Sequence, residues 1–243
     1  MKIHFYTLCK DEEELLPHVL KHYEQFVEKI VVFVNIPIHD RSIEIIDAHH
    51  LCARHSFDTQ GKLRDDIHVQ IKNYCWKESA GEADWVIVAD MDELLFHENL
   101  FDYLKECSKE GITVPLTQGV EMFADQMPKI GTRITDQITA GVHSQDFSKS
   151  IIFDPNKIEE ISYEAGAHIC WPEGYVKYSK TAELKVLHYK YIGGLARLKR
   201  RWNTMGDSLS QENIDNGWGV LRKDENELVR LYNMIRLNAG QVL

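Results

Sequence analysis

The sequence predicts an α/β fold, a three-layer α/β/α sandwich with a mainly parallel central sheet. Over the first 110 residues, short apolar runs alternate with segments whose apolar residues recur at helical spacing. This alternation is typical of βαβ units on a parallel sheet. The apolar runs are bounded by polar residues, as buried parallel strands are. The chain has 243 residues, 44% of them hydrophobic, which suits one sizeable domain.

The expected elements follow in chain order. In the first half, strands are predicted at 2–8, 30–34, 51–57 and 84–90, and helices at 15–26, 39–50, 63–80 and 99–109. Pro17 suits the first turn of the first helix. In the second half, short β-like pieces at 111–119, 148–154 and 183–189 lie among loops, and 194–211 and 221–238 have helical spacing. We expect a single domain over 1–243, with halves 1–110 and 111–243 and no linker.

Bulk composition excludes several classes of protein. The formal net charge is −10, so the basic footprint of a nucleic-acid-binding protein is missing. No segment approaches the ~18 consecutive apolar residues of a transmembrane helix, and the acidic N-terminal region lacks a signal-peptide cleavage site. The five cysteines are scattered without a CxxC pair, which predicts reduced thiols in a cytoplasmic protein rather than disulfides or a zinc site.

The fourth predicted strand runs directly into an acidic turn at Asp90, Asp92 and Glu93. Carboxylates at i and i+2 can face one hard cation. Such a pair usually binds Mg²⁺ or Mn²⁺, and the cation in turn binds phosphate oxygens. The alternative is a solvated turn that caps the next helix. The apolar strand before the turn favours a crevice at the carboxyl ends of the sheet, where open α/β sheets bind ligands.

Phosphate-binding glycine loops are missing from the sequence. GxGxxG does not follow the first strand, and GxxxxGK[ST] does not occur at all. A dinucleotide-binding dehydrogenase or a P-loop NTPase needs one of them. A diphosphate bridged to the protein by a metal therefore fits better than one held by backbone N–H groups.

Several stretches together resemble a known family. They are "CKDEEELLPHVLKHY", "IKNYCWKESAGEADWVIVADMDELL", "SKSIIFD", "YEAGAHICWPEG" and "LHYKYI". The chain resembles GT-A glycosyltransferases of the family 2-like group that includes the domain of unknown function 23 type, with a DxDE motif. The resemblance implies a GT-A, Rossmann-like fold with a nucleotide-sugar-binding half at 1–110 and an acceptor-binding half at 111–243.

The resemblance implies roles for individual residues. The activity would be metal-dependent transfer of a sugar from a UDP-sugar to a glycan or other hydroxyl acceptor, with inversion. Mn²⁺ or Mg²⁺ would be held by Asp90, Asp92 and His188, with Asp92 acting in catalysis. Asn35 stands where the family commonly has an aspartate. The expected nucleotide-sugar-binding residues are Thr7, Cys9, Glu12, Asn35, Lys72, Asn73, Asp90 and Lys190.

On the acceptor side, the resemblance implies an inverting reaction with a carboxylate base. Glu164 is the first candidate, and Glu121, Asp125 and Asp146 are its rivals. The expected acceptor-binding residues are Glu93, His168 and Trp171. The basic run 197–202 is consistent with a phosphate or an anionic membrane surface, or with a solvated helix face.

Two other functions stay open at this point. A nucleotidyltransferase acting on a sugar phosphate would show a Gly-rich loop with Arg and Lys, and "TLCKDEEE" has neither glycine nor arginine. A non-catalytic sugar-binding domain would keep the acidic turn as a remnant. The resemblance favours the transferase, and it implies surface polysaccharide biosynthesis in the cytoplasm or at the inner face of the membrane.

Overall fold

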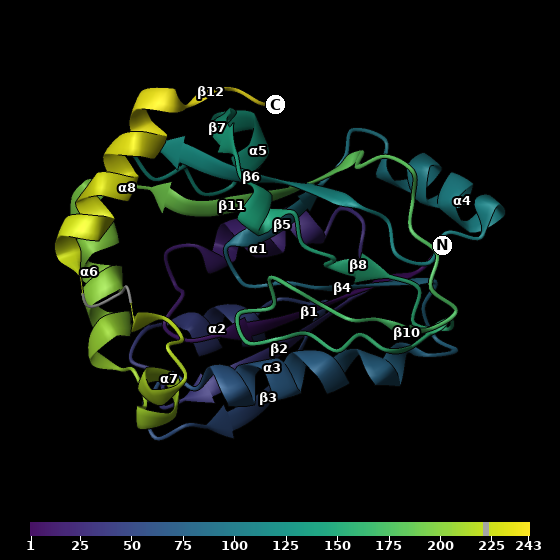
Figure 1. The fold of residues 1–243 in the computed structure, drawn as a ribbon, viewed down its shortest axis with the longest axis horizontal. Helices are drawn as coiled ribbons and strands as arrows, with labels where there is room; N and C mark the ends of the chain where they lie inside the picture. Colours follow the sequence, from purple (N-terminus) through teal and green to yellow (C-terminus); the bar gives the residue numbers. More distant parts are fainter. Residues whose placement is uncertain (221–223) are drawn as a thin grey trace.

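The computed structural model describes residues 1–220 and 224–243, which form two five-stranded sheets (Figure 1). The first sheet has the order β3-β2-β1-β4-β8. Four of its strands are parallel and β8 is antiparallel to β4. The predicted α/β class with a mainly parallel sheet is therefore confirmed. The strands are β1 (Ile3–Cys9), β2 (Lys29–Ile36), β3 (Cys52–Asp58), β4 (Trp85–Val88) and β8 (Ile152–Phe153).

Helices cover both faces of this sheet. Side chains alternate between the faces along each strand, because successive strand residues point in opposite directions. Phe5 and Val32 join the cluster that contains α1 (Leu16–Tyr23), and α2 (Ser42–Asp47) lies in the same layer. Tyr6 and Val31 pack on the other face, with α3 (Asp65–Tyr74) and the 3₁₀ turn Cys75–Ser79. These layers form the expected α/β/α sandwich.

A second sheet, which the sequence did not predict as a separate layer, has the order β12-β7-β6-β11-β5. β6 and β11 are parallel, and the other neighbours are antiparallel. β5 comes from the first half of the chain, whereas β8 of the first sheet comes from the second half, so the halves exchange strands. The strands are β5 (Glu93–Phe96), β6 (Thr117–Ala124), β7 (Ala140–His143), β11 (Leu184–Ile192) and β12 (Gly240–Gln241).

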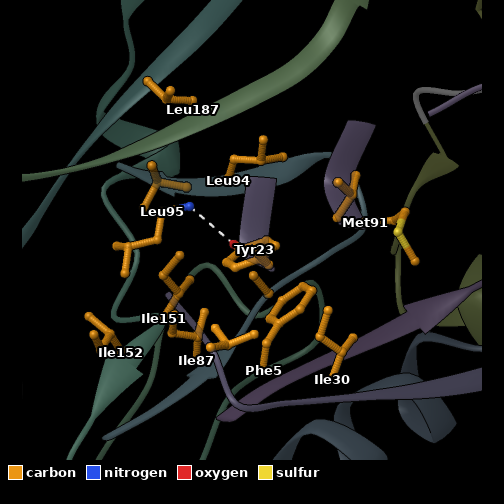
Figure 2. Packing of buried hydrophobic residues seen from close by; sticks show 14 of the residues in the cluster. Phe5, Tyr23, Ile30, Ile87, Met91, Leu94, Leu95, Ile151, Ile152 and Leu187 are labelled. Atoms are coloured by element: carbon orange, nitrogen blue, oxygen red, sulfur yellow. Dashed lines mark hydrogen bonds between the residues drawn. The ribbon is translucent and has the colours of Figure 1, made fainter. Parts of the chain in front are cut away.

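α1 joins the two sheets. Its Tyr23 ring stacks on Phe5 of β1 with 3.7 Å between ring centroids. The Tyr23 hydroxyl donates to the Glu93 carbonyl at 3.0 Å. It also accepts from the Leu95 amide at 3.1 Å (Figure 2). His22 is hydrogen-bonded through Nε2 to the Leu95 carbonyl at 2.8 Å. One helix therefore holds β5 at a defined position above the first sheet.

The C-terminal helices lie at one end of the molecule, near the carboxyl ends of β1 to β3 (Figure 1). The Leu63 amide donates to the Ser208 carbonyl at 2.7 Å, and Asn213 donates to the Asp65 carboxylate at 2.9 Å. These bonds attach the segment after β3 to the C-terminal part of the chain. The remaining elements are α4 (Leu100–Glu110), α5 (Ile134–Gln137), α6 (Gly194–Asp207), α7 (Gln211–Asp215), α8 (Glu225–Asn238), β9 (Ile158–Glu160), β10 (Glu173–Gly174) and the 3₁₀ turn Gln145–Phe147.

Several predicted boundaries were wrong. The helix predicted at 63–80 ends at Tyr74 and continues as a 3₁₀ turn, and the helix predicted at 194–211 ends at Asp207 before α7. The strand predicted at 111–119 begins only at Thr117. The first three residues of the helix predicted at 221–238 lie outside the described residues. Among the residues described, no helix is both long and apolar enough to cross a membrane.

Candidate active site

The acidic turn lies where the chain passes from one sheet to the other. β4 ends at Val88 and β5 begins at Glu93. Met91, between the two aspartates, is 4% exposed and packs in the main core (Figure 2). The Asp90 and Asp92 side chains are 38% and 26% exposed. Burial of Met91 therefore anchors the turn and leaves the two carboxylates accessible at the carboxyl end of β4.

His188 lies between two carboxylates. It is opposite Glu121 in the β11–β6 pair, and its Nδ1 donates to Glu121 at 2.6 Å. Its Nε2 is 3.3 Å from Asp92 Oδ2. Burial lowers the pKa of His188, but Glu121 and Asp92 outweigh burial and raise it to about 10. Burial raises the pKa of Asp92, but His188 outweighs it and holds this pKa well below its usual range.

Asp92 and His188 fit a divalent cation as a pair of ligands. Neighbouring ligands of an octahedral ion, each about 2.1 Å from the metal, lie roughly 3 Å apart, close to the separation of Asp92 Oδ2 and His188 Nε2. A carboxylate on Nδ1 fixes the ring orientation of a metal-binding histidine, and Glu121 occupies that position. Since only a deprotonated nitrogen binds metal, the cation would displace the Nε2 proton.

Asp90 pairs with lysines in this structure, and its role as a third metal ligand beside Asp92 and His188 stays a prediction. Lys72 Nζ lies 2.6 Å from Asp90 Oδ1, and Lys149 Nζ lies 3.9 Å from Oδ2. Burial raises the pKa of Asp90, but the two lysines outweigh burial and lower it. In the described ranges 1–220 and 224–243, no group of three His, Cys, Asp or Glu residues is arranged to hold a metal. Of the three predicted ligands, only the side chains of Asp92 and His188 lie against one another.

Glu93 is a buried strand residue and not a helix cap. It is 2% exposed, and its carboxylate pairs with Lys149. Lys149 is also 2% exposed and donates to the Gly166 carbonyl at 3.4 Å. Burial lowers the pKa of Lys149, but Glu93 and Asp90 outweigh burial and raise it. Lys149 therefore compensates the charge of the acidic turn and connects the turn to the loop at 166. Glu93, which was predicted to contact the acceptor, is buried in this ion pair.

Arginines of α6 hold the loop after β1. Arg201 makes two bonds to the Glu12 carboxylate, at 2.6 and 2.8 Å, and Arg197 bonds Glu14 at 2.6 Å. Burial raises the pKa of Glu12, and Arg201 partly offsets this. Arg201 also helps to keep the pKa of Asp92 low, so its charge acts on the metal-binding pair. The run 197–202 is therefore only partly a solvated face, because Arg197 and Arg201 turn toward the first half.

Other predicted nucleotide-binding residues have partners within the fold. Asn35 and Thr59 bond each other through both side chains, and the Asn73 amide bonds both backbone groups of Tyr163. Lys190 Nζ lies 4.9 Å from the Trp202 ring centroid. Thr7 and Cys9 are each 1% exposed. Of the predicted set, Lys72 pairs with Asp90 of the acidic turn, and Glu12 is connected to the turn through Arg201, which acts on both Glu12 and Asp92. For the other five residues, nucleotide-sugar binding stays a prediction.

The predicted acceptor residues form a second group. Trp171 is 64% exposed, and its Nε1 donates to the Glu164 carboxylate at 2.8 Å. His168 is hydrogen-bonded through Nδ1 to the Asp146 carbonyl at 2.7 Å. Phe147 stacks on His188 with 3.9 Å between ring centroids and meets His168 edge-on at 5.2 Å. Of the rival bases, Glu121 supports His188, and Asp125 accepts a hydrogen bond from Tyr232 at 2.9 Å.

Sequence reasoning missed Lys149, Phe147 and the role of Arg201. Lys149 lies within the predicted β-like piece 148–154 and the stretch "SKSIIFD", but nothing in that stretch marks its side chain as a partner of the acidic turn. A signal for α6 was present, because Arg197 and Arg201 are four residues apart and share a helix face, while Glu12 and Glu14 are two residues apart. These spacings can be interpreted only when the structure shows that α6 and the loop after β1 are in contact.

Several solved structures resemble this chain at low sequence identity. The chain spans only 28% of S. aureus TarS, which is 14% identical over 64% of this chain with a TM-score of 0.36. TarS 1–349 with UDP is 12% identical, with 86% of this chain and 65% of that one covered and a TM-score of 0.46. Mycobacterium tuberculosis glucosyl-3-phosphoglycerate synthase with Mn²⁺, UDP and glucosyl-3-phosphoglycerate is 16% identical, with 49% and 44% covered and a TM-score of 0.31.

Sequence comparison decides the family. No curated protein matches the chain. The sequence profile of glycosyltransferase family 92, in contrast, matches residues 2–217, which is most of the chain. This chain belongs to glycosyltransferase family 92.

Proposed function

We propose that this protein transfers a sugar from a nucleotide sugar, with UDP as the nucleotide, to a hydroxyl of a glycan or other acceptor, in a reaction that depends on Mn²⁺ or Mg²⁺. The observation that carries the proposal is the Asp92–His188–Glu121 arrangement at the carboxyl end of β4. Membership of glycosyltransferase family 92 supports it. The choice of UDP rests on the resemblance to GT-A enzymes.

On the donor side, Asp92 and His188 would hold the cation, and Glu121 would keep the His188 ring in place. When bound, the cation stabilises the charge that develops on the departing diphosphate. Lys72 pairs with Asp90 and so lowers the electrostatic repulsion between the carboxylates of Asp90 and Asp92. Arg201 is 24% exposed at the side chain and has N–H groups beyond the two bonded to Glu12, so it is placed to donate to a phosphate oxygen.

On the acceptor side, the proposed transfer inverts the anomeric centre in one displacement. A base must then accept the proton of the attacking hydroxyl, and Glu164, next to the exposed Trp171, is the sequence-derived candidate. The proposed role is surface polysaccharide biosynthesis in the cytoplasm, with peripheral contact at the inner face of the membrane. The five free cysteines support a reducing compartment.

The test combines binding and donor hydrolysis. Thermal unfolding is measured with Mn²⁺, UDP and both together, and hydrolysis is screened over nucleotide sugars. We expect UDP plus Mn²⁺ to raise the melting temperature and at least one UDP-sugar to be hydrolysed. Asp92→Asn should remove the Mn²⁺-dependent part of the shift, whereas Asp102→Asn, on the exposed face of α4, should keep it. A wild-type protein that neither shifts nor hydrolyses any donor would refute the proposal.

A further inference from the structure

A pocket of about 440 Å³ lies between the loops that carry Asp146 and His168. Its lining side chains come from two loops that are about 20 residues apart in sequence: Gln145, Asp146, Ser148, His168 and Ile169. Ligand pockets in proteins have volumes of about 300–1,000 Å³, so this one is large enough for a small organic molecule. The donor-side residues described above do not line it.

Both loops are attached to the acid cluster. Phe147, flanked by two lining residues, stacks on His188 at 3.9 Å. On the other loop, the Gly166 carbonyl accepts from Lys149, which pairs with Glu93 and lies 3.9 Å from Asp90. Two independent contacts therefore connect the pocket loops to the site proposed for the donor, and the Phe147 ring contacts both His188 and the lining residue His168.

The first loop is built into the second sheet. The Gly119 amide of β6 donates to Ser148 Oγ at 3.0 Å, and the Ser144 amide donates to the Gly119 carbonyl at 2.9 Å. A Cβ on Gly119 would lie 2.3 Å from the Phe147 carbonyl carbon, so only glycine permits this close approach. The pocket wall is thus rigidly positioned.

The chemistry of the lining selects the ligand. Four of the five side chains can form hydrogen bonds, and Ile169 and the nearby Trp171 add exposed apolar surface. Burial and Lys149 lower the pKa of His168, so its ring is neutral at pH 7. Asp146 then carries the one charge of the lining, and within the described part of the chain its carboxylate makes no hydrogen bond or ion pair. This surface favours hydroxyl groups and repels anions.

We propose that this pocket binds the acceptor as an uncharged sugar or polyol, and that Asp146 is the base that receives its proton. The inference rests on the proposed function. The acceptor oxygen forms a bond to the anomeric carbon, and the bond from that carbon to the diphosphate oxygen breaks, its electron pair leaving with the diphosphate. The hydroxyl proton passes to Asp146. The Glu164 carboxylate, in contrast, already accepts from Trp171 and does not line the pocket.

The experiment separates the donor side from the acceptor side. With the nucleotide sugar that the wild type hydrolyses, release of the nucleoside diphosphate is measured with methyl hexosides and with hexose 6-phosphates as acceptors. We expect the methyl hexosides to stimulate release at least tenfold more than the phosphates. Asp146→Asn should lower kcat for transfer by about 100-fold or more at a similar acceptor KM, with UDP affinity unchanged. His168→Ala should mainly raise the acceptor KM. Asp102→Asn is the matched control and should change neither.

Opposite results would overturn the inference. Preference for the hexose phosphates would refute the ligand class. If Asp146→Asn transfers normally while Glu164→Gln does not, Asp146 is not the base. A wild-type protein that neither binds UDP nor hydrolyses any donor would instead refute the proposed function. The two failures are therefore distinguishable.

Discussion

Removing the buried cation Lys149 should destabilise the protein strongly. Lys149 and Glu93 are each 2% exposed and pair with one another. Lys149→Met keeps much of the side-chain volume but leaves the Glu93 carboxylate buried without a counter-charge. Breaking a buried pair in this way costs about 3–5 kcal/mol, a large part of a typical 5–15 kcal/mol of stability. We expect the free energy of unfolding to fall by that amount.

Urea unfolding monitored by circular dichroism measures this change. The double variant Lys149→Met/Glu93→Gln removes both charges and should recover most of the loss, because the uncompensated charge is the cause. Lys105→Met, which removes a cation 3.0 Å from Asp102 at the surface, should cost under about 1 kcal/mol. A Lys149→Met loss as small as that of Lys105→Met, or a double variant no more stable than the single one, would refute the reasoning.

Three further predictions concern other parts of the molecule. Glu121→Gln should weaken Mn²⁺ binding by about tenfold, since a carboxylate partner raises the basicity of a ligating histidine; a Mn²⁺ titration of the thermal shift measures this, and an unchanged affinity would contradict it. Gly119→Ala should cost about 1–3 kcal/mol because its Cβ would overlap the 144–148 loop, whereas Gly240→Ala, with no atom within 4 Å of the added Cβ, should be tolerated. Burial lowers the pKa of His22 to about 4. Between pH 6.5 and pH 4 the unfolded chain therefore binds a proton at His22 that the folded state does not bind. The contribution of His22 to the free energy of unfolding is full above pH 6.5 and falls by about 3 kcal/mol toward pH 4. His22→Gln should flatten that part of the urea-unfolding profile, and an unchanged slope would speak against it.

The donor-side aspartate was accessible from sequence because its signal is local. The run "VIVADMD" combines a buried strand with carboxylates two residues apart, and the turn geometry follows from the buried Met91 between them. His188, in contrast, came only from the resemblance to GT-A glycosyltransferases, through its place in "LHYKYI". The lysine partners of Asp90 were not predicted, because Lys72 and Lys149 are 18 and 59 residues away. Ion pairs of this kind leave no periodic trace in the sequence.

The fold, like the site, could be predicted from the sequence only in part. The periodicity of the first 110 residues was sufficient to predict the parallel sheet, its helices and the crevice at the strand ends, because burial on one or both faces imposes a local spacing. The second sheet, the strand β5 after the acidic turn and the exchange of strands between halves depend on pairing over long sequence distances. By itself the sequence determined the acidic turn, the α/β class and the absence of a phosphate loop. Only the tertiary structure decided which cation faces each carboxylate and which side chains meet in the pocket, since those contacts join residues that chain spacing does not relate.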